Sequence, residues 1–211
     1  MKQHNKMRVG ILIFDQVEVL DVTGPFEVFS VTRMSENRRR QESSPFEVLL
    51  VSENTEQVTG VGGFIFTPDT TIHNCPHLDL LIVPGGWGTR TKISNKVIIN
   101  WIADRASKAK LTASVCTGSS LLGRAGLLNE REATTHWQAF DFLRESAPAA
   151  KVREDVRFTT APPVFTSAGI SSGIDLALKI VSYFLGIEIG KATAKHMEYP
   201  YPESDRRIVT R

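Results

Sequence analysis

Short runs of apolar residues alternate along this chain with longer segments in which apolar residues recur at helical spacing. Runs typical of strands buried on both faces of a parallel sheet occupy 7–14, 46–53, 78–86, 111–116 and 164–167. Helical spacing begins near Gly24 and returns at about 95–110, 118–128 and 171–185. Between the second and third runs, the glycine-containing segment 58–72 favours a hairpin or a pair of loops. This alternation predicts an α/β fold with helices on both faces of the sheet.

Glycine, proline and small polar residues predict where some of these elements begin and end. We expect Pro25 in the first turn of the first helix, with Thr23 or Asp21 as its cap. Gly126 is expected to weaken or end the helix that starts near 118. The segment after Met197 is expected to be irregular.

The length and composition predict one globular domain. Of the 211 residues, 41% are hydrophobic and 23% are charged, which is enough to bury a full core. No repeat, low-complexity segment or change of composition marks a second domain. We therefore predict a single domain over residues 1–211, with its core at about 7–186 and an irregular tail after about 197.

The charge balance favours neither nucleic acid nor a membrane surface as a partner. Lys and Arg number 25 against 23 Asp and Glu, so the net charge is only +2. We expect the run Arg38-Arg39-Arg40 to lie in a solvated loop. Arg206, Arg207 and Arg211 are expected to form a solvated terminus.

The N-terminal residues and the cysteines predict a cytoplasmic protein with free thiols. The four-residue apolar run after Gly10 is too short for a signal peptide or a membrane span. In a reducing compartment Cys75 and Cys116 would remain unpaired. Cys75 lies between His73 and His77, but in an extended loop these side chains alternate in direction and no fourth ligand is evident. We expect no metal site there, only a solvent-side loop.

Three candidate groups follow the predicted strands, at the sheet edge where sites gather in such folds. They are Asp21, the pair Gly85-Gly86, and Cys116. A cysteine between a strand and a helix lies beside the unpaired N–H groups that open the helix, and this predicts an acidic thiol and a thiolate nucleophile. The alternative is a small buried side chain at a strand end.

The neighbours of Cys116 also have two interpretations each. The N–H groups of Gly85-Gly86 could face a developing oxyanion, or the glycines could serve a turn that needs positive φ. Asp21 could cap the first helix, or it could face the sulfur as an acid whose pKa is raised by burial and by the thiolate. Trp87 could cover the turn or line a pocket, and we favour the pocket.

Five blocks occur in order along the chain: "LDVTGP", "LDLLIVPGGWG", "SVCTGSSLLGRAGLL", "ATTHW" and "TSAGISSGIDLAL". Together they closely resemble the DJ-1/PfpI superfamily, in particular its isocyanide (isonitrile) hydratase branch and the amidotransferase-like domains of AraC-type regulators. The resemblance covers about residues 7–186. It implies a flavodoxin-like three-layer sandwich with a mostly parallel sheet, a nucleophile-elbow cysteine and a homodimer.

The resemblance also implies roles for the matching residues. Cys116 matches the family nucleophile, and Asp21 matches its acidic partner. The backbone N–H of Thr117 would join that of Gly86 near the reacting atom. Peptidase members of the superfamily place a histidine directly after the cysteine, so Thr117 at that position argues against a Cys-His triad.

The implied activity is a cofactor-free lyase or hydrolase reaction on a small molecule, most simply the hydration of an isocyanide to an N-formamide. His136 and Gly169 would border the substrate pocket beside Trp87. A glyoxalase-like reaction on 2-oxoaldehydes remains open, as does a ligand or redox sensor. The tail after Met197 differs from the apolar, proline-containing tail of the hydratases.

Overall fold

A seven-stranded sheet runs through the middle of the structure, a computed structural model that describes residues 6–207. Neighbouring strands are parallel except for the antiparallel pair at one edge. The strands in spatial order are β10 (Phe158–Ala161), β11 (Val164–Ser167), β7 (Leu111–Val115), β6 (Leu80–Val83), β1 (Met7–Leu12), β2 (Phe46–Ser52) and β5 (Thr70–Thr71). Every residue of β6 and β7 is buried, as expected for central strands covered on both faces.

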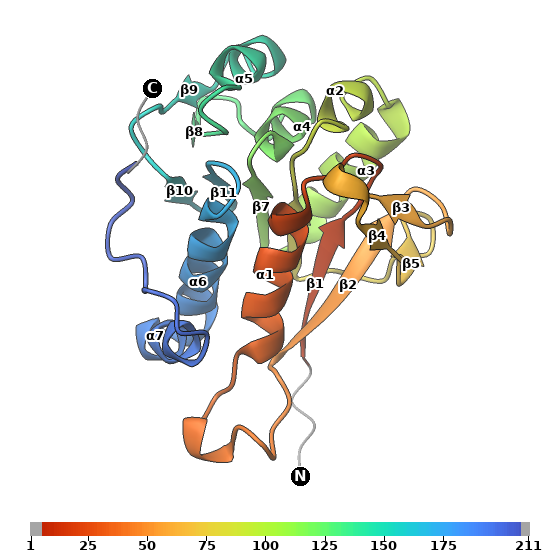
Figure 1. Cartoon of the computed structure of the whole chain (residues 1–211). Helices are drawn as coiled ribbons and strands as arrows, with labels where there is room; N and C mark the ends of the chain where they lie inside the picture. Colours follow the sequence, from red (N-terminus) through yellow and green to blue (C-terminus); the bar gives the residue numbers. More distant parts are fainter. Residues whose placement is uncertain (1–5, 208–211) are drawn as a thin grey trace.

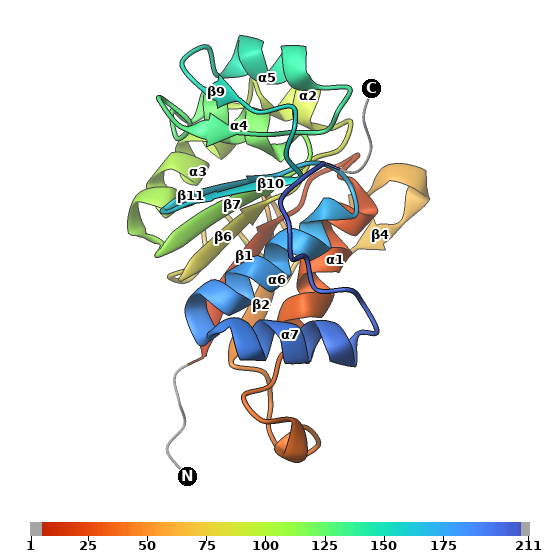
Figure 2. The same ribbon diagram turned by 90° about the vertical axis from the view of Figure 1, so that its left-hand side faces the viewer.

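Figure 2 shows the sheet between two layers of helices. One layer contains α1 (Val19–Val31), α6 (Ser172–Leu185) and α7 (Ile187–His196). The other contains α3 (Lys96–Lys108) and α4 (Gly118–Arg124), with α2 (Thr89–Lys92) and α5 (Phe140–Ser146) packed against α4. The arrangement is the predicted flavodoxin-like α/β fold, seen from the side of α1 in Figure 1.

Short elements complete the chain. A two-stranded hairpin joins β3 (Val58–Thr59) to β4 (Ile65–Phe66) around η2 (Val61–Gly63), as predicted for 58–72. A second small sheet pairs β8 (Glu132–Ala133) with β9 (Lys151–Val152). Among residues 6–207, no helix is both long and apolar enough to cross a membrane.

The first helix differs from the prediction at its N-terminus. It begins at Val19, five residues before Gly24, so Pro25 lies inside the helix and Asp21 lies in its first turn. Neither predicted cap is correct, because the N-cap position is Glu18 and the Thr23 hydroxyl donates back to the Val19 carbonyl at 2.9 Å. Burial of α1 against α6 outweighs the unfavourable effect of an internal proline. Asp21 is therefore carried by a helix that lies against the sheet.

The predicted end of α4 is confirmed, and α7 was not predicted. Gly126 has φ +78°, two residues after α4 ends. Gly186 has φ +96° and lets the chain turn from α6 directly into α7. Beyond α7 the chain contains no helix or strand up to residue 207, as expected for the tail.

The arginine run is only partly solvated, which corrects the expectation of a free loop. Arg38 and Arg40 are exposed, but Arg39 donates to the Val31 carbonyl at 2.6 Å and pairs with Glu36, whose pKa it lowers. The run lies at η1 (Glu36–Arg38) and in the loop that follows it. Carbonyls at the end of a helix have no partner within the helix, and arginines of this loop satisfy them.

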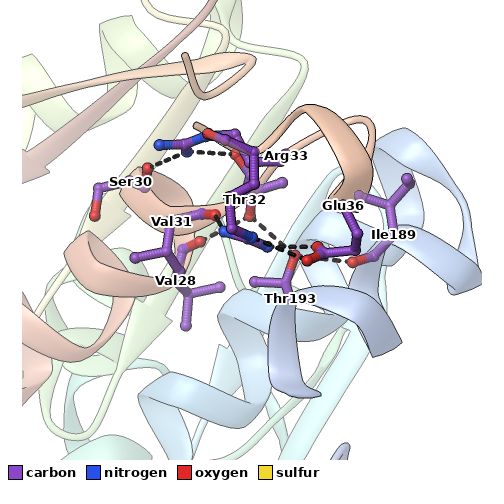
Figure 3. Close-up of polar contacts among 9 residues, drawn as sticks. Val28, Ser30, Val31, Thr32, Arg33, Glu36, Ile189 and Thr193 are labelled. Atoms are coloured by element: carbon purple, nitrogen blue, oxygen red, sulfur yellow. Dashed lines mark hydrogen bonds and ion pairs between the residues drawn. The ribbon is translucent and has the colours of Figure 1, made fainter. Parts of the chain in front are cut away.

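Figure 3 shows the same pattern at Arg33, at the C-terminal end of α1. Arg33 donates to the carbonyls of Ser30 and Thr32, each at 2.8 Å. The hydroxyl of Thr32 accepts from Thr193 of α7 at 3.3 Å. The loop and α7 are therefore both held against the end of α1.

The C-terminal arginines also differ from the expectation of a solvated terminus. Arg206 is exposed, but Arg207 is half-buried and donates to the carbonyls of Glu154 at 2.7 Å and Thr135 at 3.0 Å. Arg211 lies outside the described residues. The described end of the tail is therefore held against the protein by Arg207.

Contrary to the expectation, the loop before the third predicted strand does not lie entirely on the solvent side, because Cys75 points inward. Its side chain is buried, whereas His73 and His77 are exposed, because residues 72–74 form a turn; in an extended loop, residues two apart would point to the same side. Burial raises the pKa of the Cys75 thiol.

Candidate active site

Cys116 lies at the sharp turn between β7 and α4, in a backbone conformation that few residues other than glycine adopt. Its φ is +56°. Its N–H donates to the carbonyls of Ser167 at 3.1 Å and Ala168 at 3.2 Å. Its carbonyl accepts from the hydroxyls of Thr135 at 2.9 Å and Ser119 at 3.1 Å. These four contacts hold the strained residue in one orientation.

Two glycines allow the chain to pass close to this turn. A Cβ on Gly85 would lie 2.9 Å from the Cys116 Cβ and 2.5 Å from the Thr117 nitrogen. A Cβ on Gly169 would lie 2.8 Å from the Cys116 sulfur and 2.6 Å from Cδ2 of His136. A side chain at either position would displace the groups around the thiol.

Asp21 faces the thiol from the first turn of α1. The side chain is fully buried, and its Oδ2 accepts from the Gly85 N–H at 2.9 Å. Oδ1 makes no hydrogen bond of standard geometry with any described residue, although the carboxyl is near enough to Cys116 for their interaction to affect its pKa. Burial is the main reason that the pKa of Asp21 is raised well above its ordinary value, and the charge of Glu18 raises it further.

The thiol pKa shifts in the direction opposite to the one expected from the start of a helix. Burial raises the pKa of Cys116 well above its ordinary value, and the Asp21 carboxylate raises it further. Hydrogen bonds from the Thr117 N–H and side chain lower it, but they are the smaller effect. Both groups therefore resist ionisation together, and the pair retains at least one proton at neutral pH.

The glycine N–H groups expected to face an oxyanion have other partners. Gly85 donates to Asp21, and Gly86, at φ +118°, donates to the Thr117 hydroxyl at 3.0 Å. That hydroxyl also accepts from Thr89 at 3.1 Å. The Thr117 N–H is the backbone donor that interacts with the sulfur. Gly85 thus orients the carboxyl rather than the reacting atom.

A cavity of about 210 Å³ opens beside Cys116. Trp87 and His136 line it, and Trp87 is 63% exposed. Gly169 does not line it but supports it from behind, against the sulfur and His136. Five further lining residues were missed, because segments that are distant in sequence carry them and no pattern in the sequence places them together: Glu18, Arg90, Gln138, Ala139 and Ile170.

His136 is a neutral pocket residue. Its Nδ1 accepts from the Gln138 N–H at 3.3 Å, which requires an unprotonated nitrogen. Burial lowers the pKa of His136, and the charge of Arg207 lowers it further. The C-terminal tail therefore influences the pocket through Arg207.

Comparison with known proteins agrees with this geometry. The DJ-1/PfpI family pattern matches residues 7–183. An isonitrile hydratase of Pseudomonas putida is 35% identical over 201 residues, covering 94% of this chain and 82% of that protein. The HTH-type transcriptional regulator GbdR of Pseudomonas aeruginosa is 26% identical over 198 residues, which are 94% of this chain but only 52% of the regulator.

A solved structure supports the same assignment. The crystal structure of a THiJ/PfpI family protein from Pseudomonas syringae has a TM-score of 0.79 at 28% identity, covering 95% of this chain and 78% of that one. The fold, the sequence pattern and the relatives agree over nearly the whole chain. This chain belongs to the DJ-1/PfpI family.

Proposed function

We propose that this protein is a cysteine-dependent enzyme that adds water to the terminal carbon of a small isocyanide, giving an N-formamide. The observation that carries the proposal is the buried Asp21 carboxyl beside the Cys116 thiol, at the wall of a cavity open to a small molecule. The similarity to an isonitrile hydratase over 94% of the chain supports this choice of reaction.

The first step starts from the state in which Asp21 and Cys116 share one proton. With the proton on Asp21, the sulfur is a thiolate that accepts a hydrogen bond from the Thr117 N–H. The thiolate attacks the terminal carbon of R–N≡C, and Asp21 donates its proton to that carbon. The product is a thioimidate, R–N=CH–S–Cys116, with Asp21 now ionised.

The second step adds water and releases the cysteine. Asp21 takes a proton from a water molecule as the hydroxide adds to the thioimidate carbon, and then returns that proton to the nitrogen. When the tetrahedral species collapses, its hydroxyl proton passes to Asp21 and the C–S bond breaks. The products are R–NH–CHO, a protonated Asp21 and the Cys116 thiolate, so the sum is the addition of one water.

Burial suits Asp21 to this role. A carboxyl with an ordinary pKa is almost fully ionised at neutral pH, whereas the raised pKa of Asp21 lets it hold and donate a proton at a higher pH. Its only hydrogen bond of standard geometry within the described chain comes from Gly85 and binds one oxygen, leaving Oδ1 to exchange protons.

The decisive test is turnover by wild type and Cys116→Ala on isocyanides and on 2-oxoaldehydes, with formamide measured by mass spectrometry. We expect formamide from the isocyanides, a loss of at least about 10³-fold in Cys116→Ala, and little change in Cys75→Ala, which alters the other buried thiol. Turnover only of 2-oxoaldehydes would replace the proposal with a glyoxalase-like reaction. No turnover of either class would favour a sensor, as the likeness to GbdR suggests.

We further propose that the protein works as a cytoplasmic homodimer with a small molecule as its substrate. Light scattering of the purified full chain tests the dimer, and a mass of about one chain, 23.4 kDa, would contradict it.

A further inference from the structure

Arg90 presents a fixed positive charge to the cavity that contains Cys116. It is the second residue of α2 and lines the cavity together with Trp87. Its guanidinium lies 4.8 Å from the centre of the Trp87 ring and 5.3 Å from the centre of the Phe142 ring. Two aromatic rings therefore hold the guanidinium without occupying its N–H donors.

No carboxylate among residues 6–207 forms an ion pair with Arg90. Several other arginines are satisfied within the protein: Arg153 pairs with Asp155, Arg157 pairs with Asp175, and Arg207 donates to backbone carbonyls. Arg90 is exposed at the edge of the cavity, and its guanidinium donates to no acceptor among the described residues, so its N–H groups are available to an anionic group that enters.

The negative charges of the site lie close to the sulfur. Asp21 and Cys116 share one proton in the reactive state and so carry one negative charge between them, and Glu18 is near enough to affect the thiol. Glu18 also lines the cavity and forms no ion pair with any described residue. An anionic group is repelled from this end and attracted to Arg90, which leaves the uncharged end of the molecule toward Cys116.

We propose that Arg90 binds a carboxylate of the substrate, and that the physiological substrate is a small molecule carrying a carboxylate as well as the isocyanide. This proposal names the substrate class and rests on the function proposed above. A guanidinium matches a carboxylate with two parallel hydrogen bonds. A phosphate would bring up to two charges to one cation in a cavity that Glu18 also lines, and a cavity of about 210 Å³ accommodates only a small molecule.

The effect of the Arg90 charge on an anion in the cavity can be tested without any assumption about turnover, by alkylating Cys116. Iodoacetate is an anion and iodoacetamide is neutral, and both react with the same thiolate. We would measure the rate of each at Cys116 by peptide mass spectrometry in the full-length protein, for wild type, Arg90→Gln, Arg90→Lys and Arg124→Gln. Arg124 is the matched control, because it is exposed, lies at the end of α4 away from Cys116 and does not line the cavity.

We expect Arg90→Gln to lower the iodoacetate-to-iodoacetamide rate ratio about three- to tenfold, the effect of one nearby charge. Arg90→Lys should retain part of the ratio, and Arg124→Gln should keep that of wild type. Using a ratio corrects for any change in the folding or general reactivity of a variant. An unchanged ratio in Arg90→Gln would overturn the proposal. An equal fall in Arg124→Gln would also overturn it, because the net charge of the protein would then explain the effect.

The substrate class is tested by comparing isocyanoacetate with its neutral amide. We expect the KM of isocyanoacetate, relative to that of the amide, to rise about three- to tenfold in Arg90→Gln. If wild type hydrates only the neutral amide, or if the relative KM does not change, the carboxylate assignment is wrong. If wild type hydrates no isocyanide, the proposed function fails, while the alkylation ratio still decides whether Arg90 binds anions.

Discussion

Replacing Asp21 by asparagine should make the protein more stable and much less active. The asparagine carbonyl can still accept from the Gly85 N–H, and its uncharged amide replaces a carboxyl whose ionisation burial opposes. Leaving a buried polar atom unpaired costs about 1–3 kcal/mol and more when the group is charged, so removing the charge should raise the free energy of unfolding at pH 8 by about 1–3 kcal/mol. For a chain of this length that corresponds to an increase in Tm of roughly 2–12 °C. Loss of the proton carrier should lower kcat/KM about 10²- to 10⁴-fold.

The stability difference between Asp21→Asn and wild type should depend on pH. Because the pKa of Asp21 is raised on folding from its ordinary value of 3.8, the folded state keeps a proton that the unfolded state has lost. That contribution to stability is fully present below about pH 4 and is lost as the pH rises through the raised pKa. Asparagine does not ionise, so the difference in Tm between Asp21→Asn and wild type should be smallest near pH 4 and grow toward pH 8.

Thermal unfolding followed by circular dichroism from pH 4 to pH 8 measures the effect. Asp175→Asn is a suitable contrast, because the Asp175 carboxylate is buried in an ion pair with Arg157 and its loss should lower Tm. The midpoint of the pH–rate profile for Cys116 alkylation should also move to lower pH in Asp21→Asn, since the Asp21 charge raises the pKa of the thiol. A difference in Tm that is independent of pH, or an Asp21→Asn protein less stable than wild type at pH 8, would refute the reasoning.

Two further predictions concern the surroundings of the thiol. Gly169→Ala should destabilise the protein by about 1–3 kcal/mol and reduce kcat/KM, because its Cβ would lie 2.8 Å from the Cys116 sulfur. Gly173→Ala, whose Cβ would first meet a valine methyl at 3.0 Å, should affect catalysis less, and an equal loss in both would argue against the contact with the sulfur. Arg207→Met should raise the pKa of His136, because the charge of Arg207 lowers it. An NMR titration of His136 measures this, and an unchanged midpoint would contradict it.

The sequence alone determined the fold class and the edge of the sheet at which the chemistry lies. Apolar runs with a short period and helical segments between them are local signals, and they correctly predicted β1, β2, β6, β7, β11, α3 and α6. In a parallel sheet all such strands end at one edge, so residues that follow separate strands must converge. From that rule the sequence predicts that Cys116, Asp21 and Gly85-Gly86 lie together in one site.

Only the tertiary structure decided which groups touch and in which direction their pKa values shift. Asp21 and Gly85 are 64 residues apart, and no local pattern indicates that the Gly85 N–H is used by that carboxyl. The helix start beside Cys116 suggested an acidic thiol, but burial and the neighbouring Asp21 carboxylate reversed the direction of its pKa shift. Arg90, Glu18 and the half-buried Arg207 were missed for the same reason. Burial and distance between remote segments are properties of the packed chain, and they control ionisation more strongly than sequence neighbours do.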